Sequence, residues 1–86
     1  MVSEKITIQL ATGLHARPAS MLVALAKGFK SAISIRTNTK VANASSMINV
    51  LALGLKCGTE IEVVAEGDDE VIALKALSDF IKTLKD

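Results

Sequence analysis

Hydrophobic and polar residues alternate one by one in three stretches of the chain, and this alternation predicts β-strands with one buried face. The buried positions predicted in this way are Ile6, Ile8 and Leu10, then Ile33 and Ile35, and finally Ile61, Val63 and Ala65. A polar turn at 37–39 and a short strand through Val41 follow the second stretch. That arrangement predicts a hairpin.

Between these strands, hydrophobic residues recur every three or four positions, which predicts amphipathic helices. A first helix follows Gly13, a short one follows Ser45 and Ser46, whose hydroxyls can cap it, and a last one follows the break at Gly67. The core stripes expected are Met21, Leu22, Leu25, Ala26 and Phe29 in the first helix, Val50 and Leu53 around the short one, and Val71, Leu74, Leu77, Ile81 and Leu84 in the last.

The acidic run Asp68, Asp69 and Glu70 comes just before the last helical stripe. Carboxylates at a helix start accept free backbone N–H groups and interact favourably with the helix dipole. We therefore expect these three residues to cap the last helix, and we assign them no catalytic role.

The order of elements is strand, helix, two strands, short helix, strand and helix, without a linker, repeat or low-complexity tract. The simplest packing for this order is a mostly antiparallel sheet covered on one face by helices. The predicted fold class is therefore α+β, an open-faced two-layer β-sandwich. A chain of 86 residues fits a single domain spanning 1–86.

Composition and charge exclude several classes of function. The formal net charge is only +1, and two Phe are the only aromatic residues apart from one His, so neither the electrostatics nor the stacking surfaces of a nucleic-acid binder are present. Cys57 is the only cysteine, which rules out an internal disulfide and favours a reducing compartment. No apolar run approaches a membrane span. We expect a cytoplasmic protein without nucleic-acid partners or direct membrane insertion.

The stretch GLHARPAS, residues 13–20, places the only histidine and the only proline within four residues, with an arginine between them. Gly13 allows a sharp turn, and Pro18 suits the first turn of a helix, or its first position with Arg17 as the cap. Either placement leaves His15 near backbone N–H groups that have no partner within the helix and attract anions. The guanidinium of Arg17 matches phosphate oxygens. His15 could therefore carry a phosphoryl group as a nucleophile.

On local chemistry alone, the simpler interpretation is a surface histidine beside an ordinary helix start. A metal site lacks ligands, because no second histidine accompanies His15 and Cys57 is alone. A Ser/His/Asp hydrolase is poorly supported, because so short a chain has little room for a cleft, an orienting acid and an oxyanion hole.

The segment 13–19, GLHARPA, resembles the active-centre motif of the HPr family, the histidine-containing phosphocarriers of the bacterial phosphoenolpyruvate-dependent sugar phosphotransferase system. The resemblance extends over the whole chain, through the stretch 26–29, the Ser46 helix, the pair 53–54 and the turn at 67–70. It implies a four-stranded antiparallel sheet in the order 1-4-2-3 with three helices on one face.

The resemblance also implies the chemistry. His15 would accept a phosphoryl group on Nδ1 from phosphorylated Enzyme I and pass it to sugar-specific transporter subunits, without turnover of its own and without a cofactor. Arg17 and the backbone amide of Ala16 would stabilise the phosphate. Ser46 would be a regulatory site, with a serine kinase/phosphorylase and a catabolite-control transcription factor as further partners, and the carrier would be a monomer.

The short helix also carries an apolar cluster, Met47, Ile48 and Leu51, on one flank. Such a cluster is more often core than interface, but a helix of under three turns cannot bury every side. An exposed apolar patch beside a reactive histidine indicates a docking surface. The resemblance favours docking of partners there and on the first helix, where Ser20 would contribute.

Three classes of function remain open. The first is the phosphocarrier, and the second is a regulatory module on the same fold that acts through Ser46 and a transcription factor. His15 argues against the second, because a purely regulatory module has no use for a phosphorylatable imidazole. The third is an unrelated small binding domain.

Overall fold

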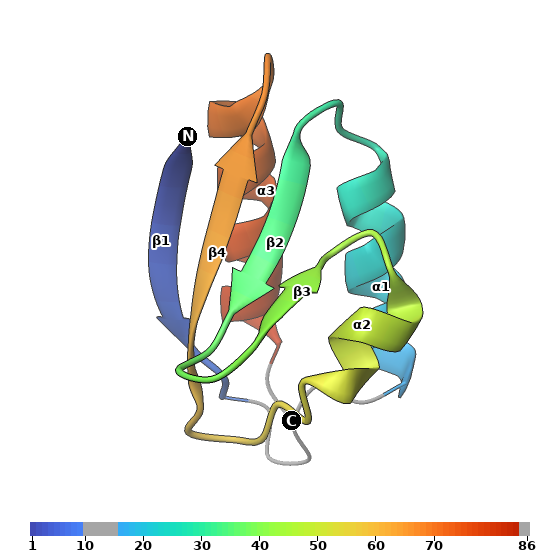
Figure 1. The fold of residues 1–86 in the computed structure, drawn as a ribbon, viewed down its shortest axis with the longest axis vertical. Coiled ribbons are helices and arrows are strands. Elements are labelled where there is room, and N and C mark those ends of the chain that lie inside the picture. Colours follow the sequence, from blue (N-terminus) through green and yellow to red (C-terminus); the bar gives the residue numbers. More distant parts are fainter. Residues whose placement is uncertain (10–15, 85–86) are drawn as a thin grey trace.

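The computed structural model describes residues 1–9 and 16–84. Four strands form one antiparallel sheet in the order β1-β4-β2-β3. The strands are β1 (Val2–Thr7), β2 (Ala32–Arg36), β3 (Val41–Asn43) and β4 (Glu60–Glu66). The helices are α1 (Ala16–Lys27), α2 (Met47–Ala52) and α3 (Glu70–Thr83). Figure 1 shows the helices on one face of the sheet, with the other face open. The predicted fold class and strand order are confirmed.

The core lies between the sheet and the helices, and the alternation in the sequence decides which side chains fill it. Ile33 and Ile35 of β2 are buried opposite Ala65 and Val63 of β4, whereas their neighbours along each strand point to the open face. Most positions expected in the core are buried or pack against it as partly buried residues. Leu10 lies outside the described residues.

Two residues expected in the helical core stripes are exposed. Met21 is 52% exposed and Val71 is 67% exposed. The buried side of α1 is formed instead by Pro18, Ala19, Leu22, Val23 and Ala26, and that of α3 by Ala73, Leu77, Ser78 and Ile81. Successive residues are about 100° apart around a helix, and this spacing places each of the two misplaced residues at the edge of the buried stripe of its helix. These two core predictions are wrong.

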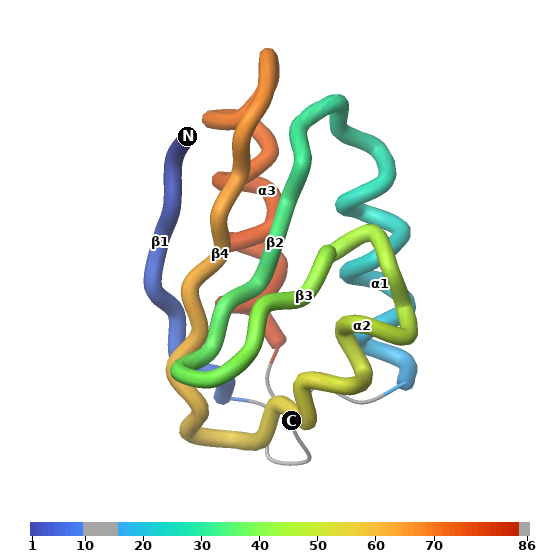
Figure 2. The backbone as a smooth tube through the Cα atoms, in the orientation of Figure 1, coloured from blue at the N-terminus to red at the C-terminus, as the bar shows by residue number. Residues whose placement is uncertain are grey.

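Asp69 was expected to cap α3 with its side chain, and it occupies the N-cap position without such a bond. Its carboxylate instead accepts hydrogen bonds from the backbone N–H of Lys30, at 2.9 Å, and from the N–H and hydroxyl of Ser31, at 2.9 and 2.5 Å. The Ser31 hydroxyl, followed by the Lys30 amide, holds the pKa of Asp69 below its usual value. The carboxylate joins the α1–β2 and β4–α3 connections, which lie at the same end of the molecule in Figure 2.

Glu70, the first residue of α3, accepts the backbone N–H of Gly67 at 3.2 Å through its Oε1, so its carboxylate bonds the preceding turn and not an amide of the helix. This contact closes the turn that leads into α3. In the part of the chain that the structure describes, no helix is long and apolar enough to cross a membrane.

Candidate functional site

The candidate site begins at the first turn of α1. The helix starts at Ala16, so Pro18 lies inside the first turn, and Arg17 is a helical residue and not the cap. Gly13 and His15 of the motif lie outside the described residues. The N–H groups at the start of an α-helix have no partner within the helix. The amides of Ala16 and Arg17 belong to this set.

The burial pattern of α1 decides which side chains face solvent. Pro18 and Ala19 are buried against the rest of the domain, whereas Ala16, Arg17 and Ser20 are exposed. The helix therefore presents a guanidinium at its positive end without a salt-bridge partner among the described residues. An anion at this end would meet the helix dipole and the guanidinium together.

Helix α2 packs beside α1, and the two enclose a shallow groove. One part of the groove is lined by Ala16, Arg17, Ser20, Met21 and Met47. The adjoining part is lined by Ser20, Val23, Ala24, Lys27 and Met47. Ser20 and Met47 line both parts. Figure 1 shows the start of α1 next to α2 at the lower right of the molecule. The groove thus combines an apolar floor with cations at Arg17 and Lys27.

The apolar cluster of α2 divides between core and surface. Ile48 is 80% exposed and Leu51 is 41% exposed, while Val50 is fully buried. Met47 is half-buried, packs against the core and reaches the groove. We call Met21, Met47, Ile48 and Leu51 the apolar patch. Met21 and Lys27 were not predicted as members of this surface.

Ser46 lies at the start of α2 and is its N-cap residue. Its hydroxyl oxygen accepts the backbone N–H of Asn49 at 3.4 Å. The side chain is half-buried and directly precedes Met47. A charge placed on Ser46 would therefore stand at the border of the apolar patch.

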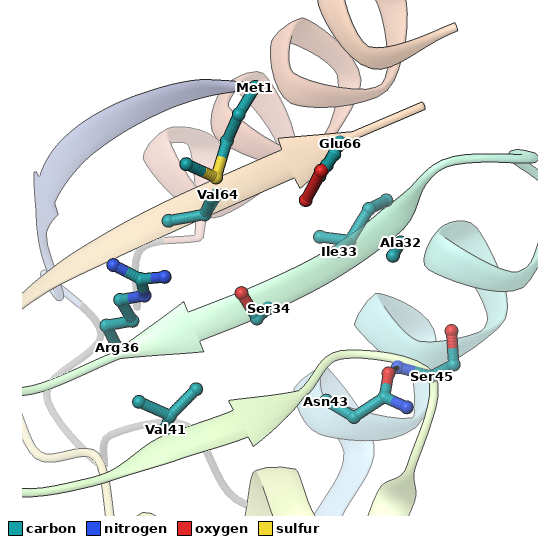
Figure 3. Close-up of a pocket in the computed structure, with 10 residues that line it drawn as sticks. All are labelled: Met1, Ala32, Ile33, Ser34, Arg36, Val41, Asn43, Ser45, Val64 and Glu66. Carbon is teal, nitrogen blue, oxygen red and sulfur yellow. Dashed lines mark hydrogen bonds between the residues drawn. The ribbon is translucent and has the colours of Figure 1, made fainter. Parts of the chain in front are cut away.

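A second hollow lies on the open face of the sheet, away from the helices. Figure 3 shows its lining, with Arg36 near one end, Glu66 near the other and the small side chain of Ser34 on the strand between them. These groups do not converge on one point. Cys57 is exposed in the loop after α2. Within residues 1–9 and 16–84, no three His, Cys, Asp or Glu side chains cluster as metal ligands.

Residues 2–83 match the family model described as the PTS HPr component phosphorylation site. The chain belongs to the HPr family. It is 45% identical over 78 residues to the phosphocarrier protein HPr of Lysinibacillus sphaericus, covering 91% of this chain and 89% of the relative. It is also 37% identical over 82 residues to the HPr-like protein Crh of Bacillus subtilis, covering 95% and 96%.

A solved HPr structure from Thermoanaerobacter tengcongensis superposes with a TM-score of 0.93 at 42% identity. The match covers 98% of this chain and 94% of that one. Membership of the HPr family therefore rests on sequence and on fold. The family is one of phosphocarriers of the phosphotransferase system.

Proposed function

We propose that this HPr-family chain accepts a phosphoryl group on His15 from phosphorylated Enzyme I and passes it to sugar-specific transporter subunits. The observation that carries the proposal is the start of α1. There, Arg17 and the first-turn amides follow His15 directly in the sequence and border the groove with α2. The same end of the helix provides positive charge and lies beside a surface on which a partner can dock.

In the proposed acceptance step, Nδ1 of His15 attacks the phosphorus of the Enzyme I phosphohistidine. The new N–P bond forms as the N–P bond in Enzyme I breaks, and the Enzyme I imidazole leaves with the electron pair. The amides of Ala16 and Arg17 and the Arg17 guanidinium stabilise the oxygens of the transferring group. In donation, a nucleophile of the transporter subunit attacks the phosphorus, the N–P bond to His15 breaks, and the His15 imidazole leaves with the electron pair. The chain therefore acts stoichiometrically and has no turnover of its own.

The experiment that tests this function is phosphorus NMR of the protein after incubation with phosphoenolpyruvate and catalytic Enzyme I. A phosphoimidazole resonance that disappears when a transporter subunit is added is the expected result. Absence of any phosphohistidine signal, with an authentic HPr as the positive control, would refute the proposal.

The similarity to the HPr-like protein Crh favours a second candidate, a regulatory module that acts through Ser46 and a transcription factor. The two candidates differ in what they require of His15. The regulatory module requires only a phosphorylated Ser46 and a partner that recognises it. The same NMR experiment separates them, since a module of that kind accepts nothing from Enzyme I.

The apolar patch is the proposed docking surface for Enzyme I, and Ile48→Ala tests it. The side chain is 80% exposed, so its loss should change the free energy of unfolding by no more than about 0.5 kcal/mol. An interface anchor contributes about 1 to 2 kcal/mol or more, so KM for this protein as the substrate of Enzyme I should rise roughly 5- to 30-fold. Steady-state transfer kinetics and urea unfolding measure the two effects.

The matched control is Val50→Ala on the same helix. Val50 is fully buried, so this variant should lose about 2 kcal/mol of stability while its folded fraction keeps a normal KM. If Ile48→Ala behaves like Val50→Ala, the patch is part of the core and the docking assignment fails.

Ser46→Asp is expected to inhibit phosphorylation of His15 without unfolding the protein. Asp is as good an N-cap as Ser, and a negative charge is favoured at a helix start, so the melting temperature should be equal or slightly higher. Docking must desolvate the new charge, which lies next to Met47. Electrostatic inhibition of this kind should weaken as salt is added. Thermal melts and phosphorylation rates at two salt concentrations measure both effects.

Ser45→Asp is the matched control, because it adds the same charge one residue earlier. Ser45 lines the hollow on the open face of the sheet and not the groove between α1 and α2 (Figure 3). It should therefore inhibit much less. Equal inhibition by the two variants would mean that net charge, and not the position of Ser46, controls the rate.

A further inference from the structure

A lysine from the β2–β3 hairpin reaches the far end of α2. The Nζ of Lys40 donates a hydrogen bond to the backbone carbonyl of Ala52 at 3.3 Å. Ala52 is the last residue of α2, and Lys40 directly precedes β3. The contact therefore joins two elements that are twelve residues apart in the sequence.

The hairpin turn fixes the backbone from which Lys40 extends. The N–H of Thr37 donates to the carbonyl of Lys40 at 2.8 Å, and the N–H of Lys40 donates to the Thr37 hydroxyl oxygen at 3.1 Å. The same oxygen accepts the N–H of Thr39 at 3.4 Å. Residues 37–39 line a common hollow with Leu53 and Leu55, which places the turn against the segment that leaves α2.

The hydrogen bond from Lys40 stabilises the C-terminal end of helix α2. It has only six residues, and isolated helices of that length are not stable in water. The last carbonyls of a helix have no partner within it and carry partial negative charge. The last turn of α2 contains no basic residue of its own. The ammonium group of Lys40 supplies both the hydrogen bond and the charge.

We infer that Lys40 is a positioning residue for docking, because its ammonium group holds the last turn of α2 and so fixes the direction in which Leu51 and Ile48 face a partner. The inference rests on the proposed function, in which the apolar patch receives Enzyme I. Loss of the contact loosens the helix end before docking. The encounter is weakened, whereas the transfer chemistry at His15 is unchanged.

Four variants of the full chain separate this role from a direct effect of charge on the partner. Lys40→Gln removes the ammonium group, and Lys40→Arg keeps a cationic donor. Lys56→Gln removes a positive charge from the loop that follows α2, where the lysine side chain makes no hydrogen bond or salt bridge to the described residues. Thr37→Val keeps the charge and the side-chain shape but removes the hydroxyl that orders the turn.

Amide hydrogen exchange of Leu53 and Gly54, which donate to carbonyls in the last turn of α2, reports on the helix end. Lys40→Gln should speed this exchange about two- to fivefold, the range expected for a cation at a helix C-terminus. It should raise KM for Enzyme I by a similar factor at unchanged kcat. Thr37→Val should shift both quantities in the same direction, and Lys40→Arg should lie closer to the parent than Lys40→Gln does.

A raised KM in Lys40→Gln with parental exchange rates, or an equal rise in Lys56→Gln, would overturn the inference and assign the effect to charge alone. A parental KM in Lys40→Gln would overturn it as well. Failure of the proposed function is a separate outcome, because the parent protein would then accept no phosphoryl group at all while the exchange measurement would still report on the helix end.

Discussion

His15→Ala is expected to abolish acceptance of a phosphoryl group from Enzyme I. The chain contains one histidine, so no second imidazole can take over as the nucleophile. An amide or guanidinium can stabilise a transferring phosphoryl group, but neither can form the N–P bond of a phosphohistidine. Radiolabelled phosphoenolpyruvate with catalytic Enzyme I measures the incorporation, which should fall to background. Acid-labile labelling of the variant would refute the assignment.

The result is informative only if the variant is folded, which a thermal melt and a circular dichroism spectrum establish. The core identified among the described residues is formed by the aliphatic side chains between the sheet and the helices, such as Leu22, Ile35 and Leu77. These remain in place in His15→Ala. We therefore expect a cooperative transition near that of the parent.

Arg17→Gln separates the nucleophile from the group that stabilises it. The variant should still accept the phosphoryl group but more slowly, by about tenfold, because one charged donor is lost while the first-turn amides remain. Arg36→Gln is the matched control, since Arg36 is an exposed arginine on the open face of the sheet. Equal rates of phosphoryl acceptance in the two variants would mean that Arg17 is a solvated charge without a role in stabilising the phosphoryl group.

The elements of this fold were predictable because each is encoded by a local pattern. The alternation around Ile33 and Ile35 requires only that one face of a strand be buried, and the structure buries both residues. Met21 and Val71 were misplaced because both border a helical stripe, where periodicity cannot decide between core and surface. Met21 is exposed because α2 packs near it and leaves a groove, and the Met21 side chain lines this groove.

Contacts between distant segments were not predictable from local patterns. The sequence places Asp69 at a helix start, where a capping bond is the local expectation. In the structure, its carboxylate accepts hydrogen bonds from the N–H groups of Lys30 and Ser31, which lie 39 and 38 residues away. The contact between Lys40 and Ala52 is of the same kind, since nothing in the local sequence of either residue indicates the other.

The candidate site also has a part that the local sequence predicts and a part that depends on contacts between distant segments. The motif at 13–19 and the resemblance predict the chemistry, and the position of His15 lies outside the described residues. The described residues add the surface around the motif. Ser20 and Met47 line both parts of one groove, and Ile48 and Leu51 extend the patch. Which residues of two neighbouring helices share a groove depends on how the helices pack, which the pattern of either helix does not specify.

Gly67→Ala is expected to be the most destabilising small substitution in the turn between β4 and α3. Gly67 has a φ of +152°, a conformation that side-chain-bearing residues rarely adopt. A Cβ at this position would lie 2.7 Å from the Cα of Ser31 and 2.8 Å from its hydroxyl oxygen. Ser31 has little freedom to retreat, because its N–H and hydroxyl are both bonded to Asp69.

Backbone strain of this kind costs about 1 to 3 kcal/mol, and overpacking costs a similar amount. Together they predict a loss of roughly 2 to 6 kcal/mol, a large part of the stability of a small domain. Urea unfolding at a constant m-value measures the loss. Gly54→Ala is the matched control. Gly54 also has a positive φ, of 61°, but nothing lies within 4 Å of the Cβ position, so only about 1 to 2 kcal/mol should be lost.

If the two substitutions lower the free energy of unfolding by the same amount, backbone conformation alone sets the penalty. The predicted clash between a Cβ at position 67 and Ser31 would then be refuted. The folded fraction of Gly67→Ala gives an independent check. Ser31 follows the C-terminal end of α1, and the candidate site lies at the other end, about 18 Å away along the twelve residues of the helix. The α1–β2 and β4–α3 connections both lie far from the start of α1 in Figure 2. Phosphoryl acceptance per folded molecule should therefore equal that of the parent, and a reduced rate would show that this end of the domain influences the site.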